Sequence, residues 1–104
     1  MDYKIISRRI QFDENGFLVK PKSWNEDVAE LIAYKQGLNN ISETHWNIIY
    51  SVRNLYAQNN TVPMVGQICS DLKLSLRQIY KLFPEGPVKG LLKIAGLPKP
   101  ENCV

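Results

Sequence analysis

The last residues of the sequence hold the side chain best suited to chemistry, the thiol of Cys103, which only Val104 follows. Residues 97–102 lead up to it, and the prolines at positions 98 and 100 favour an extended, semi-rigid arm. A thiol at the tip of such an arm can enter the active site of a partner protein, where its thiolate form is the reactive one. We therefore predict that Cys103 is the catalytic residue and that it carries a chemical group between proteins.

Other enzyme chemistry has little support in the sequence. There is no glycine-rich phosphate loop, and neither HExxH nor CxxC spacing occurs, so we expect no cofactor and no metal site. His45 is the only histidine and stands near the expected start of a helix, where we expect it to make local hydrogen bonds rather than to act as a base. Cys69 falls within an apolar helical pattern, which indicates a buried structural thiol.

Size and composition indicate a single domain over residues 1–104. A chain of 104 residues with 44% apolar and 22% charged residues is typical of a globular protein with one modest core. No apolar run approaches the ~20 residues of a membrane span, and the N-terminus lacks the apolar core of a signal peptide. Two cysteines do not make a disulfide framework, so we expect a reducing, cytoplasmic location.

The net charge of +3 lies in the same part of the sequence as Cys103. Residues 1–76 carry eight basic and eight acidic residues, whereas residues 77–104 carry five basic residues against two acidic ones. Such an excess is most often a solvated surface, but it also fits a surface that meets an acidic partner or nucleic acid. The charge alone does not decide between these interpretations.

The predicted elements are a β-hairpin followed by helices. β-Prone runs on either side of Asn15-Gly16 predict a hairpin over about 3–20. A capping box at Ser23 and Glu26 predicts a first helix over about 24–36 that Gly37 ends. The second helix is predicted to begin after Ser42 and to end at Asn59-Asn60, with one apolar stripe through Trp46, Ile49, Val52 and Tyr56.

Shorter helices are predicted after the second one. Pro63 can start a third helix that runs to Leu72, and Ser75 caps a fourth. We expect the fourth helix to bury one face, made of Leu76, Ile79, Tyr80 and Phe83. A fifth helix over about 87–95 ends at Gly96, so a helical bundle over about 24–96 precedes the arm at 97–104. The predicted fold is mainly α (α+β), a small helical bundle with an N-terminal hairpin.

The C-terminal sequence resembles the signature of the DsrC/TusE family. The similarity lies in residues 82–87 (LFPEGP), 93–100 (KIAGLPKP) and 103–104 (CV), and it extends upstream to Asp13, Gly16, Phe17, Trp24, His45, Trp46, Arg53 and Pro63. The resemblance implies an orthogonal helical bundle with a small hairpin and a mobile C-terminal arm. It also implies that Cys103 accepts sulfur as a persulfide, which makes the chain a sulfurtransferase that acts as a carrier.

The resemblance favours one branch of that family. Members linked to dissimilatory sulfite reductase carry a second arm cysteine, which aligns with Leu92 here, so Cys103 lacks an intramolecular partner. This departure resembles the TusE branch, which takes sulfur from a TusBCD- or DsrEFH-type complex and passes it to an MnmA-type enzyme that thiolates the wobble uridine of certain tRNAs. A DsrC-like role in dissimilatory sulfur metabolism, with sulfite reductase as acceptor, stays open. Gly66 stands where the family often has an arginine, which puts docking or thiol reactivity in doubt.

Two alternatives from other functional classes remain. Residues 65–81 have helix-turn-helix proportions, and Arg77, Gln78 and Lys81 stand where a recognition helix would contact DNA. Because short packed helices joined by a tight turn are common, we rank direct DNA binding below sulfur transfer. The second alternative is a subunit that only docks on a sulfur-metabolising enzyme and needs no thiol.

Overall fold

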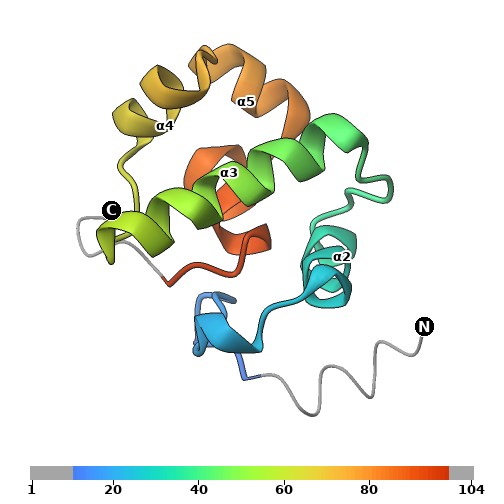
Figure 1. Ribbon diagram of the computed structural model, residues 1–104. Coiled ribbons are helices and arrows are strands. Elements are labelled where there is room, and N and C mark those ends of the chain that lie inside the picture. The colour runs from blue at the N-terminus through green and yellow to red at the C-terminus, as the bar shows by residue number, and fades with distance from the viewer. Residues whose placement is uncertain (1–10, 99–104) are drawn as a thin grey trace.

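The computed structural model describes residues 11–98, and within that range the protein is mainly helical. The elements are η1 (Pro21–Ser23), α2 (Glu26–Lys35), α3 (Glu43–Asn59), α4 (Val65–Leu72), α5 (Leu76–Leu82) and η2 (Pro87–Leu92). Figure 1 shows α3 crossing the front of the molecule with η2 behind it, while α4 and α5 lie above and α2 lies to one side. Within residues 11–98, none of the helices has the length and apolarity that crossing a bilayer requires.

The core forms where α3 and η2 meet. Helix α3 contacts both α4 and η2, and α5 also contacts η2. The predicted stripe on α3 is confirmed, because Ile49 and Val52 are fully buried and Trp46 and Tyr56 pack against the core. The other elements contribute buried side chains to the same cluster, among them Val28, Ile32, Ile68, Ile79, Phe83, Leu91, Leu92 and Ile94.

The predicted N-terminal hairpin is not supported. Residues 3–10 lie outside the described range, and residues 11–98 contain no strand, only a single antiparallel bridge between Phe12 and Leu18. The turn between them is well formed, since the Asp13 carboxylate accepts hydrogen bonds from two backbone N–H groups and Gly16 has φ +86°. Pro21 then begins η1, which leaves too few residues after the turn to extend the pairing.

Helix α2 begins two residues later than the sequence pattern predicts. Ser23 lies in the 3₁₀ turn η1, and the cap is instead Asn25, whose side chain accepts a 2.9 Å hydrogen bond from the N–H of Val28. Asparagine caps as well as serine does, and only the path of the chain into the helix decides between them. The predicted end is confirmed, because Gly37 has φ +84° and terminates α2.

Helix α4 begins later than predicted, and helix α5 exposes two residues that were predicted to be buried. Helix α4 starts at Val65, since Pro63 precedes an extended Met64 that occupies the cap position. Ser75 caps α5 as predicted, and Ile79 and Phe83 are buried. The prediction that Leu76 and Tyr80 are buried is wrong, because they are 46% and 51% exposed. Helix α5 is only seven residues long, and Ile79 is its one buried residue.

The predicted fifth helix is helical but of a different type. Over Pro87–Leu92 its turns are those of a π-helix, and Gly90, Leu91 and Leu92 are all buried there. The spacing of apolar residues does not distinguish the wider π turn from an α turn, so the sequence pattern missed it. Gly96, with φ +74°, ends the segment as predicted, and Leu97 beyond it is still buried in the core, with Pro98 partly buried.

Candidate functional site: the root of the C-terminal arm

The predicted catalytic residue Cys103 lies outside the residues that the structure describes, as does Lys99. The structure does describe the segment from which the arm departs. We call residues 94–96 the arm root, and their backbone groups are held by side chains from distant parts of the chain. The segment that the sequence predicts to carry the reactive thiol follows directly after these residues.

Trp24 contacts the arm root from the segment between η1 and α2. Its indole N–H donates a 2.9 Å hydrogen bond to the backbone carbonyl oxygen of Ile94. Trp24 can reach this carbonyl because η1 and the Asn25 cap hold the backbone extended between them, with Trp24 at φ −72° and ψ 142°. Ile94 is itself fully buried, so the bond joins the entrance of α2 to the core.

Arg53 contacts the arm root from α3. Its Nη1 donates a 2.6 Å hydrogen bond to the backbone carbonyl oxygen of Ala95, and its guanidinium lies 4.0 Å above the Trp24 ring. Burial lowers the pKa of Arg53 from its ordinary value, while the nearby Tyr50 acts in the opposite direction. The group nonetheless stays a cation at neutral pH, because an arginine starts from so high a pKa. A charge-assisted hydrogen bond of this kind is stronger than a neutral one.

Gly96 completes the arm root by close approach. The Leu97 N–H bonds to the Leu92 carbonyl at 3.2 Å and the Gly96 N–H to the Lys93 carbonyl at 3.1 Å, which is the pattern of a glycine-terminated helix end. A Cβ atom on Gly96 would overlap Cδ1 of Trp24 and lie only 2.7 Å from Cγ. Glycine is therefore required twice here, by the positive φ and by the packed indole.

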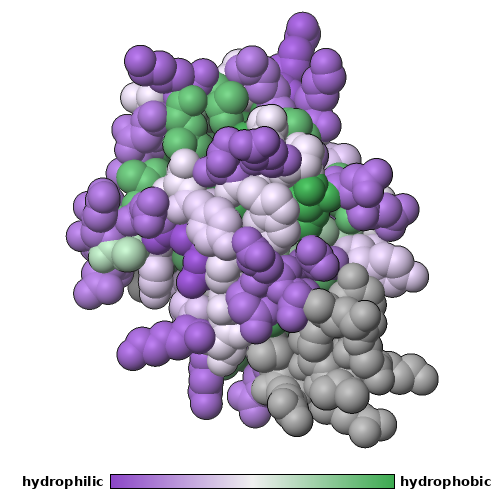
Figure 2. Space-filling model, turned by 45° about the vertical axis from the view of Figure 1, so that its right-hand side comes forward, coloured by the Kyte–Doolittle hydropathy of each residue, from purple (hydrophilic) through white to green (hydrophobic). Residues whose placement is uncertain are grey.

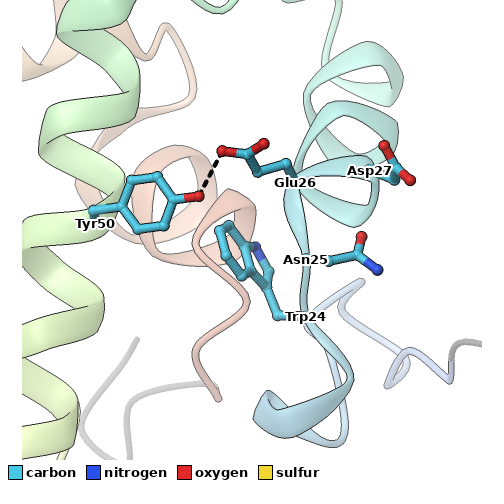
Figure 3. Close-up of a pocket in the computed structure, with 5 residues that line it drawn as sticks. All are labelled: Trp24, Asn25, Glu26, Asp27 and Tyr50. Carbon is cyan, nitrogen blue, oxygen red and sulfur yellow. Dashed lines mark hydrogen bonds between the residues drawn. The ribbon is translucent and has the colours of Figure 1, made fainter.

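An open pocket of about 440 Å³ adjoins the arm root. Trp24, Asn25, Glu26, Asp27 and Tyr50 line it, and Figure 3 shows Glu26 reaching across to Tyr50 while Asp27 points away. The Tyr50 hydroxyl donates a 2.6 Å hydrogen bond to Glu26, which together with burial raises the pKa of Tyr50. The Tyr50 ring also meets the Trp24 ring edge-to-face, with centroids 5.7 Å apart. The contact network of the arm root thus extends to the first turn of α2.

Lys93 stands directly before the arm root and brings positive charge to it. Its ammonium lies 5.0 Å from the centroid of the Phe17 ring, in the turn near the N-terminus of the described chain. Together with Lys35 it lines a second pocket of about 310 Å³ that includes Phe12, Gln36 and Glu85. Cationic groups favour the thiolate form of a nearby cysteine, but the position of Cys103 relative to Lys93 lies outside the described residues.

The remaining candidates from the sequence are structural. His45 is buried, with one ring nitrogen 2.7 Å from the Ser42 hydroxyl and the other 2.8 Å from the Leu82 carbonyl oxygen. It therefore caps α3 and ties it to the end of α5, as the sequence predicts for a local hydrogen-bonding role. Cys69 is partly buried and packs against the core, and it makes no disulfide within residues 11–98.

The residues proposed for DNA contact lie on the exposed side of α5. Arg77 and Lys81 are exposed, but the Gln78 side chain accepts a 2.8 Å hydrogen bond from the Ser75 N–H and completes a capping box. The Oε1 atom of Gln78 is therefore engaged in the cap of α5, although the residue itself is exposed. At Gly66, where the family often has arginine, no described atom lies within 4 Å of an added Cβ, so a side chain fits there.

The contacts that Trp24 and Arg53 make with the arm root could not be derived from local sequence spacing. The sequence analysis named these two residues only as part of the family resemblance. One signal was nonetheless present in α3. Arg53 follows Trp46 by seven residues and Ile49 by four, so it falls on the apolar stripe. A cation on the buried side of a helix indicates a specific partner, since an unpaired buried charge is costly.

Comparison with known proteins shows which family the chain resembles. A family model described as "DsrC like protein" matches residues 4–104. The chain is 41% identical over 102 residues to "Sulfurtransferase TusE" of Sodalis glossinidius, with 91% of this chain and 94% of the relative covered. It is 37% identical over 97 residues to "Sulfite reductase, dissimilatory-type subunit gamma" of Nitratidesulfovibrio vulgaris, with 93% and 92% covered.

A solved structure gives the same result for the fold. The chain matches the crystal structure of the oxidized gamma-subunit of the dissimilatory sulfite reductase (DsrC) from Archaeoglobus fulgidus with a TM-score of 0.82 and 37% identity. The match covers 91% of this chain and 92% of that one. Family match, sequence identity and fold agree over nearly the whole length, and the chain therefore belongs to the DsrC family.

Proposed function

We propose that the protein is a sulfur carrier that accepts sulfur as a persulfide on Cys103 and relays it to an acceptor protein. Relatives named as sulfurtransferases and as a sulfite reductase subunit support a role in sulfur transfer. The observation that carries the proposal is the arm root. Trp24 and Arg53 hold two successive backbone carbonyls immediately before the segment that bears Cys103.

The transfer step needs no cofactor. The Cys103 thiolate attacks the terminal sulfur of a persulfide on the donor, the donor's S–S bond breaks, and its sulfur leaves as a thiolate. One disulfide-type bond forms as one breaks, so the step is redox-neutral and consumes no oxidant. A cysteine of the acceptor then takes the terminal sulfur from Cys103 by the same exchange, which returns Cys103 to its thiolate.

The division of the chain follows from this chemistry. A body over about 24–96 holds the arm root, and the segment at 97–104, whose first residue Leu97 is buried in the core, delivers the thiol within a single domain. Fixing the departure point and using two prolines to restrict the arm both reduce the entropy lost on docking. A carrier with a fixed root therefore searches a smaller volume than one with a free tail.

We infer that the acceptor belongs to tRNA wobble-uridine 2-thiolation. The donor would be a TusBCD-type complex and the acceptor an MnmA-type enzyme, in the reducing cytoplasm, where a lone thiol stays available. The alternative is a DsrC-like role with a sulfite reductase. Position 92 aligns with the second arm cysteine of those proteins, but here it is a leucine, so this chain has no second thiol there to form an intramolecular bond. Leu92 is instead a fully buried core residue of η2.

Complementation tests the proposal. A bacterial strain that lacks its TusE protein receives the wild type, Cys103→Ser or Cys69→Ala, and tRNA 2-thiouridine is measured by mass spectrometry. We expect the wild type and Cys69→Ala to restore the modified base and Cys103→Ser to leave it absent. Restoration by Cys103→Ser would instead support a docking subunit that needs no thiol.

A further inference from the structure

The turn at residues 12–18 contacts the chain directly before the arm root. Figure 1 shows this turn, in blue, below the red segment that ends the described chain. The contact is made with Lys93, the residue that precedes the arm root. The function proposed above gives no role to the turn or to this lysine, although Trp24 and Arg53 hold the next two residues along the chain.

Lys93 lies against the turn along the outer half of its side chain. A Cβ added to Gly16 would lie 3.3 Å from Nζ of Lys93, 3.7 Å from Cε and 3.8 Å from Cδ. The same Nζ lies 5.0 Å from the centroid of the Phe17 ring. Figure 2 shows hydrophilic side chains that project into solvent from much of the visible face, whereas Lys93 is partly buried. The lysine is therefore held against the protein by its contacts with the turn.

The turn is itself fixed in place. Phe17 and Leu18 are only 2% and 1% exposed, and Leu18 belongs to the hydrophobic core. The Asp13 carboxylate accepts hydrogen bonds from the N–H groups of Asn15 and Phe17, at 2.8 and 3.0 Å. A cation is attracted to the face of an aromatic ring. Because the Phe17 ring is anchored in the body, this attraction restrains the position of Lys93.

The backbone of Lys93 connects this restraint to the arm root. Its carbonyl oxygen accepts a 3.1 Å hydrogen bond from the N–H of Gly96, the residue with which the arm root ends. Trp24 and Arg53 bind the carbonyls of the two residues that lie between Lys93 and Gly96. The turn at 12–18 thus adds a third contact, from a third part of the chain, to four consecutive residues.

We propose that Lys93 is a positioning residue for the loading of Cys103 by its sulfur donor, and that Gly16 and Phe17 hold it in place. This inference rests on the proposed function. The role of Lys93 is to fix the point from which the segment bearing Cys103 starts, rather than to react with the sulfur. A misplaced reacting group slows the chemical step itself, so loss of the contact should lower kcat and not raise KM.

Lys35 supplies a matched control for Lys93. Its ammonium lies 5.2 Å from the centroid of the Phe12 ring, in the same turn. Both lysines also line the same pocket of about 310 Å³, together with Glu85. Lys35→Gln and Lys93→Gln therefore remove the same charge from one pocket and one contact of a cation with an aromatic ring each. Only Lys93 stands next to the arm root.

The rate of Cys103 persulfide formation, measured against the concentration of purified TusBCD-type complex, tests the proposal. We expect Lys93→Gln to lower kcat about fivefold with KM within about twofold, and Lys35→Gln to leave both within about twofold. Lys93→Arg keeps a cation that can lie over the Phe17 ring, so it should retain most of the kcat. An unaltered kcat in Lys93→Gln, or an equal loss in Lys35→Gln, would overturn the proposal.

A double-mutant cycle tests whether Lys93 acts through Phe17. Phe17→Leu removes the ring and keeps an apolar side chain in the core, and it should lower kcat on its own. In the presence of Lys93→Gln it should lower kcat little further, because the two changes remove one shared contact. Hydrogen exchange of the Gly96 amide should accelerate in each single variant. Multiplicative effects on kcat, or unchanged exchange at Gly96, would contradict the inference.

Loading of Cys103 by a small-molecule persulfide separates this inference from the proposed function. A small donor reaches the thiol wherever the arm starts, so all the variants should load at the wild-type rate. Failure of the wild type to load would refute the carrier function instead. Slower loading of Lys93→Gln by the small molecule would overturn the positioning role, because the lysine would then act on the reactivity of the thiol.

Discussion

The indole N–H of Trp24 donates a 2.9 Å hydrogen bond to the backbone carbonyl oxygen of Ile94, 70 residues further along the chain. The bond joins the entrance of α2 to the root of the arm that carries Cys103. Arg53 makes the equivalent contact from α3 to the next carbonyl, that of Ala95, and lies over the same indole ring. Two parts of the chain thus fix one short backbone segment, so substitutions in either should alter how the arm is held.

Replacing Gly96 with alanine should destabilise the protein more than the same change at Gly37. Both glycines have positive φ, +74° and +84°, so each alanine costs about 1 kcal/mol from the backbone alone. No described atom lies within 4 Å of a Cβ on Gly37, whereas a Cβ on Gly96 overlaps the Trp24 ring. Overpacking adds about 1–3 kcal/mol at Gly96. Chemical denaturation measures both losses, and equal values would show that the indole is not packed against Gly96.

Trp24→Phe should loosen the arm root while keeping an aromatic ring in place. Loss of the hydrogen bond to Ile94 should lower the free energy of unfolding by about 1 kcal/mol. Hydrogen exchange of the Gly96 and Leu97 amides should accelerate with it. Trp46→Phe serves as control, because that indole packs on Tyr50 and makes no hydrogen bond to residues 11–98. If Trp46→Phe accelerated hydrogen exchange of the Gly96 and Leu97 amides equally, the hydrogen bond from Trp24 would not be what stabilises the arm root.

Arg53→Lys should slow sulfur transfer although it preserves the charge. A lysine ammonium cannot both lie flat on the Trp24 ring and reach the Ala95 carbonyl at 2.6 Å as the planar guanidinium does. We expect a stability loss of about 1–2 kcal/mol and a several-fold lower rate of Cys103 loading by the donor. Arg77→Lys, on the exposed side of α5, should change neither the stability nor the kcat of loading. An unaltered loading rate in Arg53→Lys would show that the contacts of Arg53 with the arm root do not contribute to sulfur transfer.

The bond between Tyr50 and Glu26 should make the protein more sensitive to alkaline pH. The hydrogen bond to Glu26 raises the pKa of Tyr50 above its ordinary value of 10.0. A raised folded-state pKa gives stability that is fully present below the unfolded pKa and is lost as pH rises through the folded value. Tyr50→Phe should therefore show a shallower alkaline decline than the wild type. Glu26→Gln should lower the phenol pKa, as followed by ultraviolet absorbance, and an unmoved titration would exclude Glu26 as its cause.

Much of the fold is encoded in local signals that the sequence displays. Ser42 and Ser75 cap α3 and α5 as predicted, and Gly37 and Gly96 end their segments, because caps and positive-φ glycines act within a few residues. Ser23 failed as a cap because Asn25, an equally good one, lies two residues on. The predicted hairpin is not supported within residues 11–98, where Pro21 starts η1 soon after the single bridge between Phe12 and Leu18.

The site was less predictable because its contacts are long-range. Periodicity placed Tyr80 on the inner face of α5, but burial depends on which neighbours cover that face, and the Tyr80 ring, which packs against Gly86, is 51% exposed. The contact of Trp24 with Ile94 spans 70 residues, which no window of local spacing can reveal. Cys103 itself could be identified from its chemistry and its place behind two prolines, and its catalytic role stays a prediction.

The most direct test of the account is the mass of the intact protein after sulfur loading. The protein is incubated with a cysteine desulfurase, cysteine and purified TusBCD-type relay proteins, and then analysed under non-reducing conditions with Cys69→Ala and Cys103→Ser alongside. We predict that the wild type and Cys69→Ala gain the mass of one sulfur atom, which maps to Cys103 and is removed by a reductant, while Cys103→Ser gains none. A sulfur atom that fails to appear on Cys103, or that appears equally in Cys103→Ser, would contradict the account.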